Sequence, residues 1–146
     1  MGEIYNGLEE IGLDAFLVNP RSDSTLNHTL AIHLEHNCLT VEKFSPHSGL
    51  DKRPVHLFLD YNGLESLPED TLLGFLMANP NNVLTLDRNQ IVCDSRVKWL
   101  KDRSTEFETR VDGADCINDV GQTVFTSDLV NQEAGDNNGL HFLCYK

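Results

Sequence analysis

Imidazole and carboxylate side chains recur at matching places in three similar stretches of the sequence. TLAIHLEHNCL contains His33, Glu35 and His36, PVHLFLDYNGL contains Asp60, and NNVLTLDRNQI contains Asp87. These side-chain types can exchange protons or bind a metal ion. His33, His36 and Asp60 are the candidates for a metal site. However, His33 and His36 are three residues apart, which puts them on opposite faces of an ideal strand, so no metal site is predicted.

Motifs that define common enzyme sites are absent from the sequence. It contains no Gly-rich phosphate loop, no G-x-S-x-G and no H-E-x-x-H, and no Ser or Cys stands at a motif-defined nucleophile position. We therefore expect no catalytic residues, no cofactor and no enzymatic activity. An enzyme is the third-ranked hypothesis. It would be supported if the protein showed turnover that His33→Ala abolished.

The three stretches share a pattern that would position these polar side chains. Each has an aliphatic residue, a Leu two positions later, an Asn three positions further on, and a Leu or Ile two positions after the Asn. The string YNGLE at residues 61–65 also occurs at residues 5–9, which adds a fourth Asn. The Asn residues are separated by 31 (37 − 6), 25 (62 − 37) and 27 (89 − 62) positions. This regularity indicates an internal repeat rather than an isolated Asn-Gly hairpin turn.

Each shared stretch is expected to contain a short strand. Alternate side chains of a strand face opposite sides, so the aliphatic pairs should form one core and the residues between them should face outward in rows. The predicted inward pairs are Ile32 and Leu34, Leu57 and Leu59, and Leu84 and Leu86. The predicted outward rows are His33, Phe58 and Thr85; Glu35, Asp60 and Asp87; and His36, Tyr61 and Arg88.

The middle outward row consists only of carboxylates. Such a row favours a partner with a basic surface, and Phe58 and Tyr61 would then be aromatic anchors. The alternative is a solvated acidic face that His36 and Arg88 partly neutralise. The nine residues of the three rows are the candidate partner-binding residues.

The repeat pattern resembles the leucine-rich repeat superfamily over roughly residues 1–89, whose repeats are about 20 to 29 residues long. Thr29, Pro54 and Asn81 depart from it, because the family usually has Leu at that first consensus position. The resemblance implies an α/β solenoid, with short parallel strands on a concave side and helices or irregular segments on a convex side. It also implies that the concave face binds the ligand. We divide the chain into about four repeats at residues 1–91, the first truncated, a C-terminal cap at 92–129 and a flexible tail at 130–146.

Residues after Asn89 resemble the cysteine-flanked C-terminal cap of secreted leucine-rich repeat proteins. Four residues match that pattern: Cys93, Trp99, Leu100 and Cys116. The local sequence is also similar to that of arthropod secreted proteins related to the non-catalytic subunit of oplophorus-luciferin monooxygenase. The resemblance implies a disulfide between Cys93 and Cys116, although Ser95 replaces the second cysteine of the family.

Two cysteines, Cys38 and Cys144, lie outside this match. Cys38 is expected to be a buried or free thiol, and Cys144 comes later than the family pattern suggests. A zinc site at Cys93 is disfavoured because no C-x-x-C or paired His accompanies it.

The connecting segments differ in how clearly they predict structure. SLPEDTLLGFLMANP reads as a helix with Ser66 as its cap and with Leu72, Phe75 and Leu76 on one face. Asp94 is expected to cap a short helix that buries Val97 and Leu100, with Trp99 packed over the last repeat. The segment 40–54 should be irregular, and residues 130–139 should be disordered.

Composition restricts the class of partner and the compartment. The formal net charge of -12 argues against nucleic acid and anionic membranes, and no apolar run is long enough to span a bilayer. The sequence lacks a signal peptide, and Met1 falls on the first inward position of a predicted strand with no polar cap before it. We therefore expect an N-terminally truncated fragment of an extracellular protein, with Asn27 in a weak glycosylation sequon. The predicted function is a non-catalytic protein-binding or scaffold module. The alternative is a cytoplasmic adaptor with reduced cysteines, which mass spectrometry of the bridge would distinguish.

Overall fold

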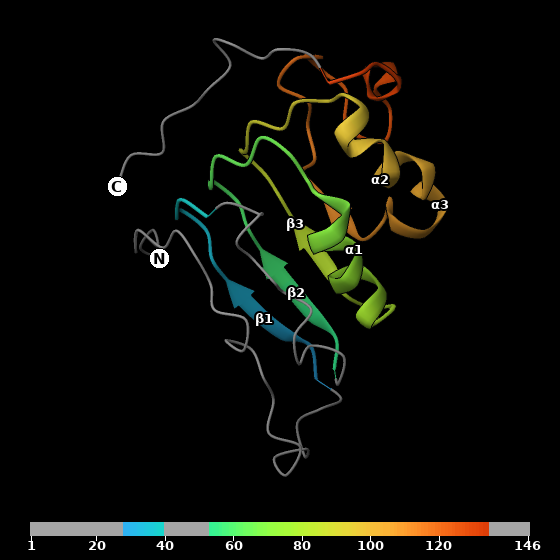
Figure 1. The fold of residues 1–146 in the computed structure, drawn as a ribbon. Helices are drawn as coiled ribbons and strands as arrows, with labels where there is room; N and C mark the ends of the chain where they lie inside the picture. Colours follow the sequence, from blue (N-terminus) through green and yellow to red (C-terminus); the bar gives the residue numbers. More distant parts are fainter. Residues whose placement is uncertain (1–27, 40–52, 135–146) are drawn as a thin grey trace.

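The computed structural model describes residues 28–39 and 53–134, and these form an α/β arrangement around one parallel sheet (Figure 1). The strands, in sheet order, are β1 (Leu30–His33), β2 (Val55–Phe58), β3 (Val83–Thr85) and β4 (Val111–Asp112). The helices are α1 (Glu69–Ala78), α2 (Lys98–Asp102) and α3 (Ser104–Phe107), with 3₁₀ turns η3 (Ser95–Val97) and η4 (Asp128–Asn131). The predicted first repeat, Asn27, the segment 40–52 and residues 135–146 lie outside the described residues.

The sheet has the strand register that the sequence pattern predicts. Ile32 pairs with Leu57, which pairs with Leu84, and all neighbouring strands run parallel. The aliphatic pairs of β2 and β3 are buried, whereas Ile32 and Leu34 are half-buried and pack against the same core. Sequence neighbours of the buried residues face the other side, which confirms the predicted alternation.

Helix α1 packs against the core with the face that its spacing predicts. Leu72, Phe75 and Leu76 are buried there. The predicted cap at Ser66 is wrong, because the helix begins later: Pro68 is the N-cap residue, its carbonyl accepts from the Leu72 N–H at 3.1 Å, and no side chain caps the helix. Glu69 and Asp70 follow in the first turn, where negative charge favours the helix dipole.

The C-terminal end of α1 receives a long-range clamp from Arg110. The guanidinium donates to the carbonyl groups of Leu76, Asn79 and Asn82, and it lies 5.2 Å from the centre of the Phe107 ring. Burial lowers the pKa of Arg110. These bonds satisfy carbonyl groups that a helix end leaves without intrahelical partners.

The recurring Asn residues join successive strand–turn units. The Asn62 Oδ1 accepts from the Leu39 N–H at 3.2 Å, and its Nδ2 donates to the Leu34 and Leu59 carbonyl groups, both at 2.9 Å. Asn89 repeats the arrangement one unit later, accepting from the N–H groups of Asn62 and Leu64. Each amide therefore binds both its own turn and the preceding one, as the donors and acceptor of Asn allow.

A left-handed residue precedes each Asn of this series. His36, Tyr61 and Arg88 have φ angles of 59°, 58° and 62°. Their place in an outward row was predicted, but their left-handed backbone was not, because such positions usually hold Gly or Asn. The repeated conformation bends the chain away from each strand at the same point.

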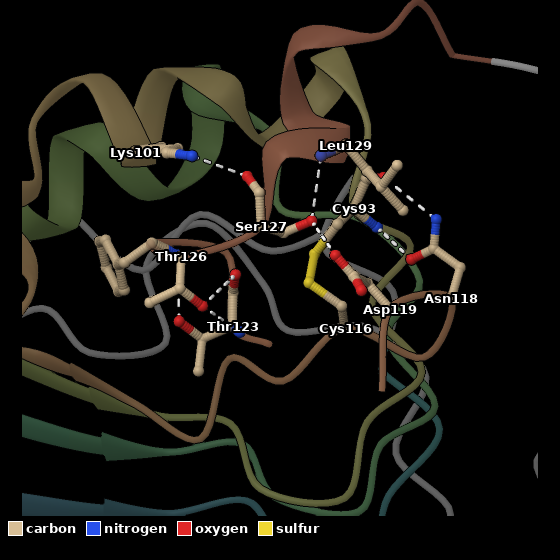
Figure 2. Close-up of a disulfide and its surroundings, with 10 residues drawn as sticks. Cys93, Lys101, Cys116, Asn118, Asp119, Thr123, Thr126, Ser127 and Leu129 are labelled. Carbon is tan, nitrogen blue, oxygen red and sulfur yellow. Dashed lines mark hydrogen bonds between the residues drawn. A yellow bond between two sulfur atoms is a disulfide. The ribbon is translucent and has the colours of Figure 1, made fainter. Parts of the chain in front are cut away.

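The predicted disulfide joins Cys93 to Cys116, whose Cα atoms are 5.5 Å apart (Figure 2). Asn118 ties the same corner, since its side chain accepts from the Cys93 N–H at 2.9 Å and donates to the Cys93 carbonyl at 3.1 Å. Ser127 is buried beside it, and its hydroxyl donates to Asp119 at 2.7 Å. This end of the molecule is thus held by contacts that occur once each.

Three other predictions for the cap region are confirmed. Asp94 caps η3 by accepting from the Arg96 N–H, and Val97 and Leu100 are buried as predicted. Trp99 packs against the core, and its Nε1 donates to the Leu67 carbonyl at 2.8 Å.

Two expectations are wrong. Cys38 is half-buried and disulfide-bonded rather than free, and its partner lies outside the described residues. Val130, expected at the start of a disordered tail, is buried in η4 because that turn folds back onto the cap.

Candidate functional site

Polar and aromatic side chains gather on the sheet face opposite to the buried aliphatic pairs, which we call the open face. It contains the nine residues predicted from the sequence and three that the prediction missed. All of them lie on a strand or in the turn that follows it. The open face is formed by His33, Glu35, His36, His56, Phe58, Asp60, Tyr61, Thr85, Asp87, Arg88, Asp112 and Asp115.

Phe58 lies at the centre of the row formed by the last residues of β1, β2 and β3. It pairs with His33 on β1 and Thr85 on β3 in the sheet register, as predicted. The His33 ring stacks on Phe58 at 4.3 Å between centroids, with 9° between the planes, and the His56 ring stacks on it at 3.8 Å and 18°. A nitrogen of each imidazole also has a polar neighbour: His33 Nδ1 lies 2.8 Å from Glu35 Oε1, and His56 Nε2 lies 2.6 Å from Thr85 Oγ1.

The acidic row runs across the turns that follow β1, β2 and β3. Asp60 lies in its middle and accepts from the Asp87 N–H at 2.9 Å. Burial raises the pKa of Asp60, the Asp87 N–H lowers it, and the charges of Asp87, Glu35 and Asp112 raise it further. The row therefore concentrates like charges that a cationic group would offset.

The third row follows the left-handed turn positions. The ring of His36 stacks on Tyr61 at 4.3 Å between centroids with 15° between the planes, and Tyr61 is 48% exposed. Arg88 occupies the corresponding position of the next turn and is exposed. This row presents two aromatic rings followed by a cation.

A shallow hollow of about 390 Å³ lies where the third row meets the cap. Its charged members are Asp87, Arg88 and Asp115. Gly113 keeps the chain close to Asp87: its φ is +77°, and a Cβ there would lie 2.7 Å from the Asp87 backbone nitrogen. The remaining lining residues are Asn89, Cys116 and Ile117.

The prediction missed His56, Asp112 and Asp115 for two reasons. His56 precedes Leu57, the first inward residue of its stretch, whereas the predicted outward rows contain only residues that follow the first inward residue. Asp112 and Asp115 belong to a fourth unit, because β4 pairs with β3 through Leu84 and Val111. The signal was the spacing: Val111 follows Leu84 by 27 (111 − 84) positions, the same interval that separates Leu84 from Leu57.

Residues 28–39 and 53–134 contain neither a metal-binding cluster nor a membrane-spanning helix. No group of three or more His, Cys, Asp or Glu side chains in these ranges is arranged to hold a metal ion, and His33, His36 and Asp60 do not form one. None of the helices in the same ranges has the length and apolar character needed to cross a bilayer.

A scan of the sequence against models of known protein families finds no match, and searches among curated proteins and among solved structures find none either. Membership of the leucine-rich repeat superfamily therefore stays a prediction from the residues.

Proposed function

We propose that this chain is a leucine-rich repeat solenoid that binds a partner protein with its open face and has no catalytic role. The parallel strands, the Asn side chains that join successive turns and the disulfide-bonded cap support this proposal. In such a solenoid the open face would be the concave side. The partner would present a basic surface to it, and the chain would act as a binding or scaffold module.

The observation that carries this proposal is the alignment of unlike side chains on one exposed face. Stacked rings occupy the β1 and β2 part of the open face, and carboxylates dominate its β3 and β4 part. Aromatic residues commonly anchor protein interfaces, and charge complementarity directs the partner to them. A basic side chain of the partner would enter the hollow between Asp87 and Asp115.

The disulfides favour an extracellular site of action. Cys93 and Cys116 are bonded, and so is Cys38, and disulfides persist mainly in oxidising compartments. A cytoplasmic adaptor is the second candidate. Mass spectrometry of the natural protein distinguishes the two, because an adaptor would yield free thiols at Cys93 and Cys116.

The test reverses charge in the acidic row. Asp60→Lys combined with Asp87→Lys should weaken binding of a labelled lysine-rich peptide, and of any partner captured with the full chain, by about 2 kcal/mol or more at low ionic strength. Titration of fluorescence anisotropy at two salt concentrations measures this loss. The remaining affinity should also depend less on salt, because fewer opposite charges would be in contact.

A matched control changes the same net charge elsewhere. Glu108→Lys combined with Glu133→Lys alters two exposed carboxylates outside the open face and should leave the affinity close to that of the wild type. Thermal melts check that both double variants are folded. Equal binding by the wild type and the Asp60/Asp87 variant at low salt would contradict the proposal and reduce the acidic row to a solvated face.

A further inference from the structure

The open face combines its carboxylates with two imidazoles that share one aromatic ring. His33 and His56 both stack on Phe58, which brings them together from β1 and β2. We infer that docking on the open face is pH-dependent, because protons taken up by His33 and His56 offset the carboxylates and release a basic partner. This inference rests on the proposed function and specifies how it is regulated.

The balance of charge on the open face makes the inference quantitative. Five carboxylates, those of Glu35, Asp60, Asp87, Asp112 and Asp115, stand against one permanent cation, Arg88. Two protons on the imidazoles would halve that excess of negative charge. Imidazole is the side chain whose charge most readily changes within the pH range of biological compartments.

The charged groups around each imidazole decide how it responds. The charged neighbours of His33 are Glu35, which lies in the turn after β1, and His56, which lies on β2. His56 faces His33 from β1, Asp112 from β4 and the neutral hydroxyl of Thr85 from β3. Because the two imidazoles lie on one ring, a proton on either disfavours a proton on the other.

Burial lowers the pKa of His56, the charge of His33 lowers it further, and Asp112 opposes this shift. His56 is therefore neutral at pH 7 and takes up its proton only at a pH below the ordinary value. The raised pKa of Asp60 acts in the same direction on the surface, since a carboxyl that is protonated earlier also removes negative charge as the pH falls. Acidification thus reduces the attraction for a cation at both groups.

Protonation should change the surface without unfolding the sheet. A hydroxyl can donate or accept, so Thr85 can keep its hydrogen bond with His56 in either protonation state. The His33 side chain is 50% exposed and lies 2.8 Å from Glu35, so a charged ring there keeps both water and an anionic neighbour. The expected readout is therefore binding rather than stability.

The experiment measures the affinity of a fluorescein-labelled decalysine peptide at pH 7.5 and 5.5, at one low ionic strength. Wild-type affinity should fall about tenfold or more across this interval, because each protonated imidazole adds a positive charge to the face that binds a cationic peptide. His33→Gln combined with His56→Gln removes the two rings that stack on Phe58 and leaves His36 on Tyr61, and its affinity should change by less than about threefold. His28→Gln, at an exposed residue before β1, is the matched control and should show the wild-type loss.

The outcomes separate the two proposals. Equal wild-type affinity at both pH values overturns the pH-dependence and leaves the binding function standing. A wild-type loss that persists in the His33/His56 variant also overturns it and assigns the effect to other groups of the open face, His36 or Asp60. Failure of the peptide to bind at pH 7.5 contradicts the binding function itself. Melting curves of each protein at both pH values confirm that the comparison is made between folded states.

Discussion

The strand units and the C-terminal cap are stabilised in different ways. Between the strands the same contacts recur at each step: buried aliphatic pairs, a left-handed turn residue, and an Asn that bonds two turns. In the cap each contact occurs once, as with the disulfide at Cys93, the Asn118 bonds and the buried Ser127. Stability in the first region is therefore shared among equivalent positions, whereas in the cap it depends on particular side chains.

This difference has a consequence for damage. In a repeating region a lost contact leaves similar neighbours intact, but a buried charge disrupts the shared core of all units. In the cap a lost contact has no equivalent elsewhere, yet many of its polar residues are exposed and bond to water when released. The comparison can be tested by substitutions of the same kind placed in each region.

The largest effect is expected from a charge in the shared core. Leu57→Asp should leave no folded protein, because Leu57 is 0% exposed and the carboxylate would have no partner there. Phe58→Asp, one residue further on the open face, should leave the fold largely intact. Circular dichroism and thermal melts of both variants measure the contrast, and the reverse order would show that the strand register is wrong.

An intermediate effect is expected from the Asn residues of the two regions. Asn62→Ala removes a 2% exposed side chain whose bonds serve several buried backbone groups, so it should lower the free energy of unfolding by about 3 kcal/mol. Asn118→Ala breaks two bonds to Cys93 at an exposed site and should cost about 1 kcal/mol. Urea denaturation compares them; equal losses would contradict the claim that the two regions differ.

The smallest effect concerns the glycines at the junction and in the cap. Gly113→Ala should destabilise the protein by about 1 kcal/mol more than Gly121→Ala. Both glycines have positive φ angles, so the cost of the left-handed backbone largely cancels, but only at Gly113 would the new Cβ meet backbone atoms, those of Asp87. Melting temperatures of the two variants provide the measurement, and a larger loss at Gly121 would refute the close approach.

Local sequence patterns were sufficient for the parts that repeat. The alternation around Leu57 and Leu84 predicted the strand register, and the spacing of Leu72, Phe75 and Leu76 predicted the buried face of α1. The rows of the open face followed from the same alternation. Residues three or four apart on a helix, and two apart on a strand, share a face whatever the rest of the chain does.

Features that depend on distant partners were not accessible to that reasoning. β4 was missed because it is only two residues long and because Cys116 occupies the position at which earlier units have Asn. The Arg110 guanidinium donates to the Leu76 carbonyl of α1, which lies 34 positions away in the sequence. No local sequence pattern predicts such a bond. The bonded state of Cys38 likewise depends on a cysteine elsewhere in the chain.

The left-handed residues of the turns bear on how this protein could be engineered. His36, Tyr61 and Arg88 each hold a bulky side chain in a conformation that costs an ordinary residue roughly 1 kcal/mol and glycine almost nothing. Glycine at these places would relieve strain in the folded state, while the added freedom of the unfolded chain would offset part of the gain. It would also delete one row of the open face. Selection for thermal tolerance alone would thus tend to erase the surface to which we assign the function.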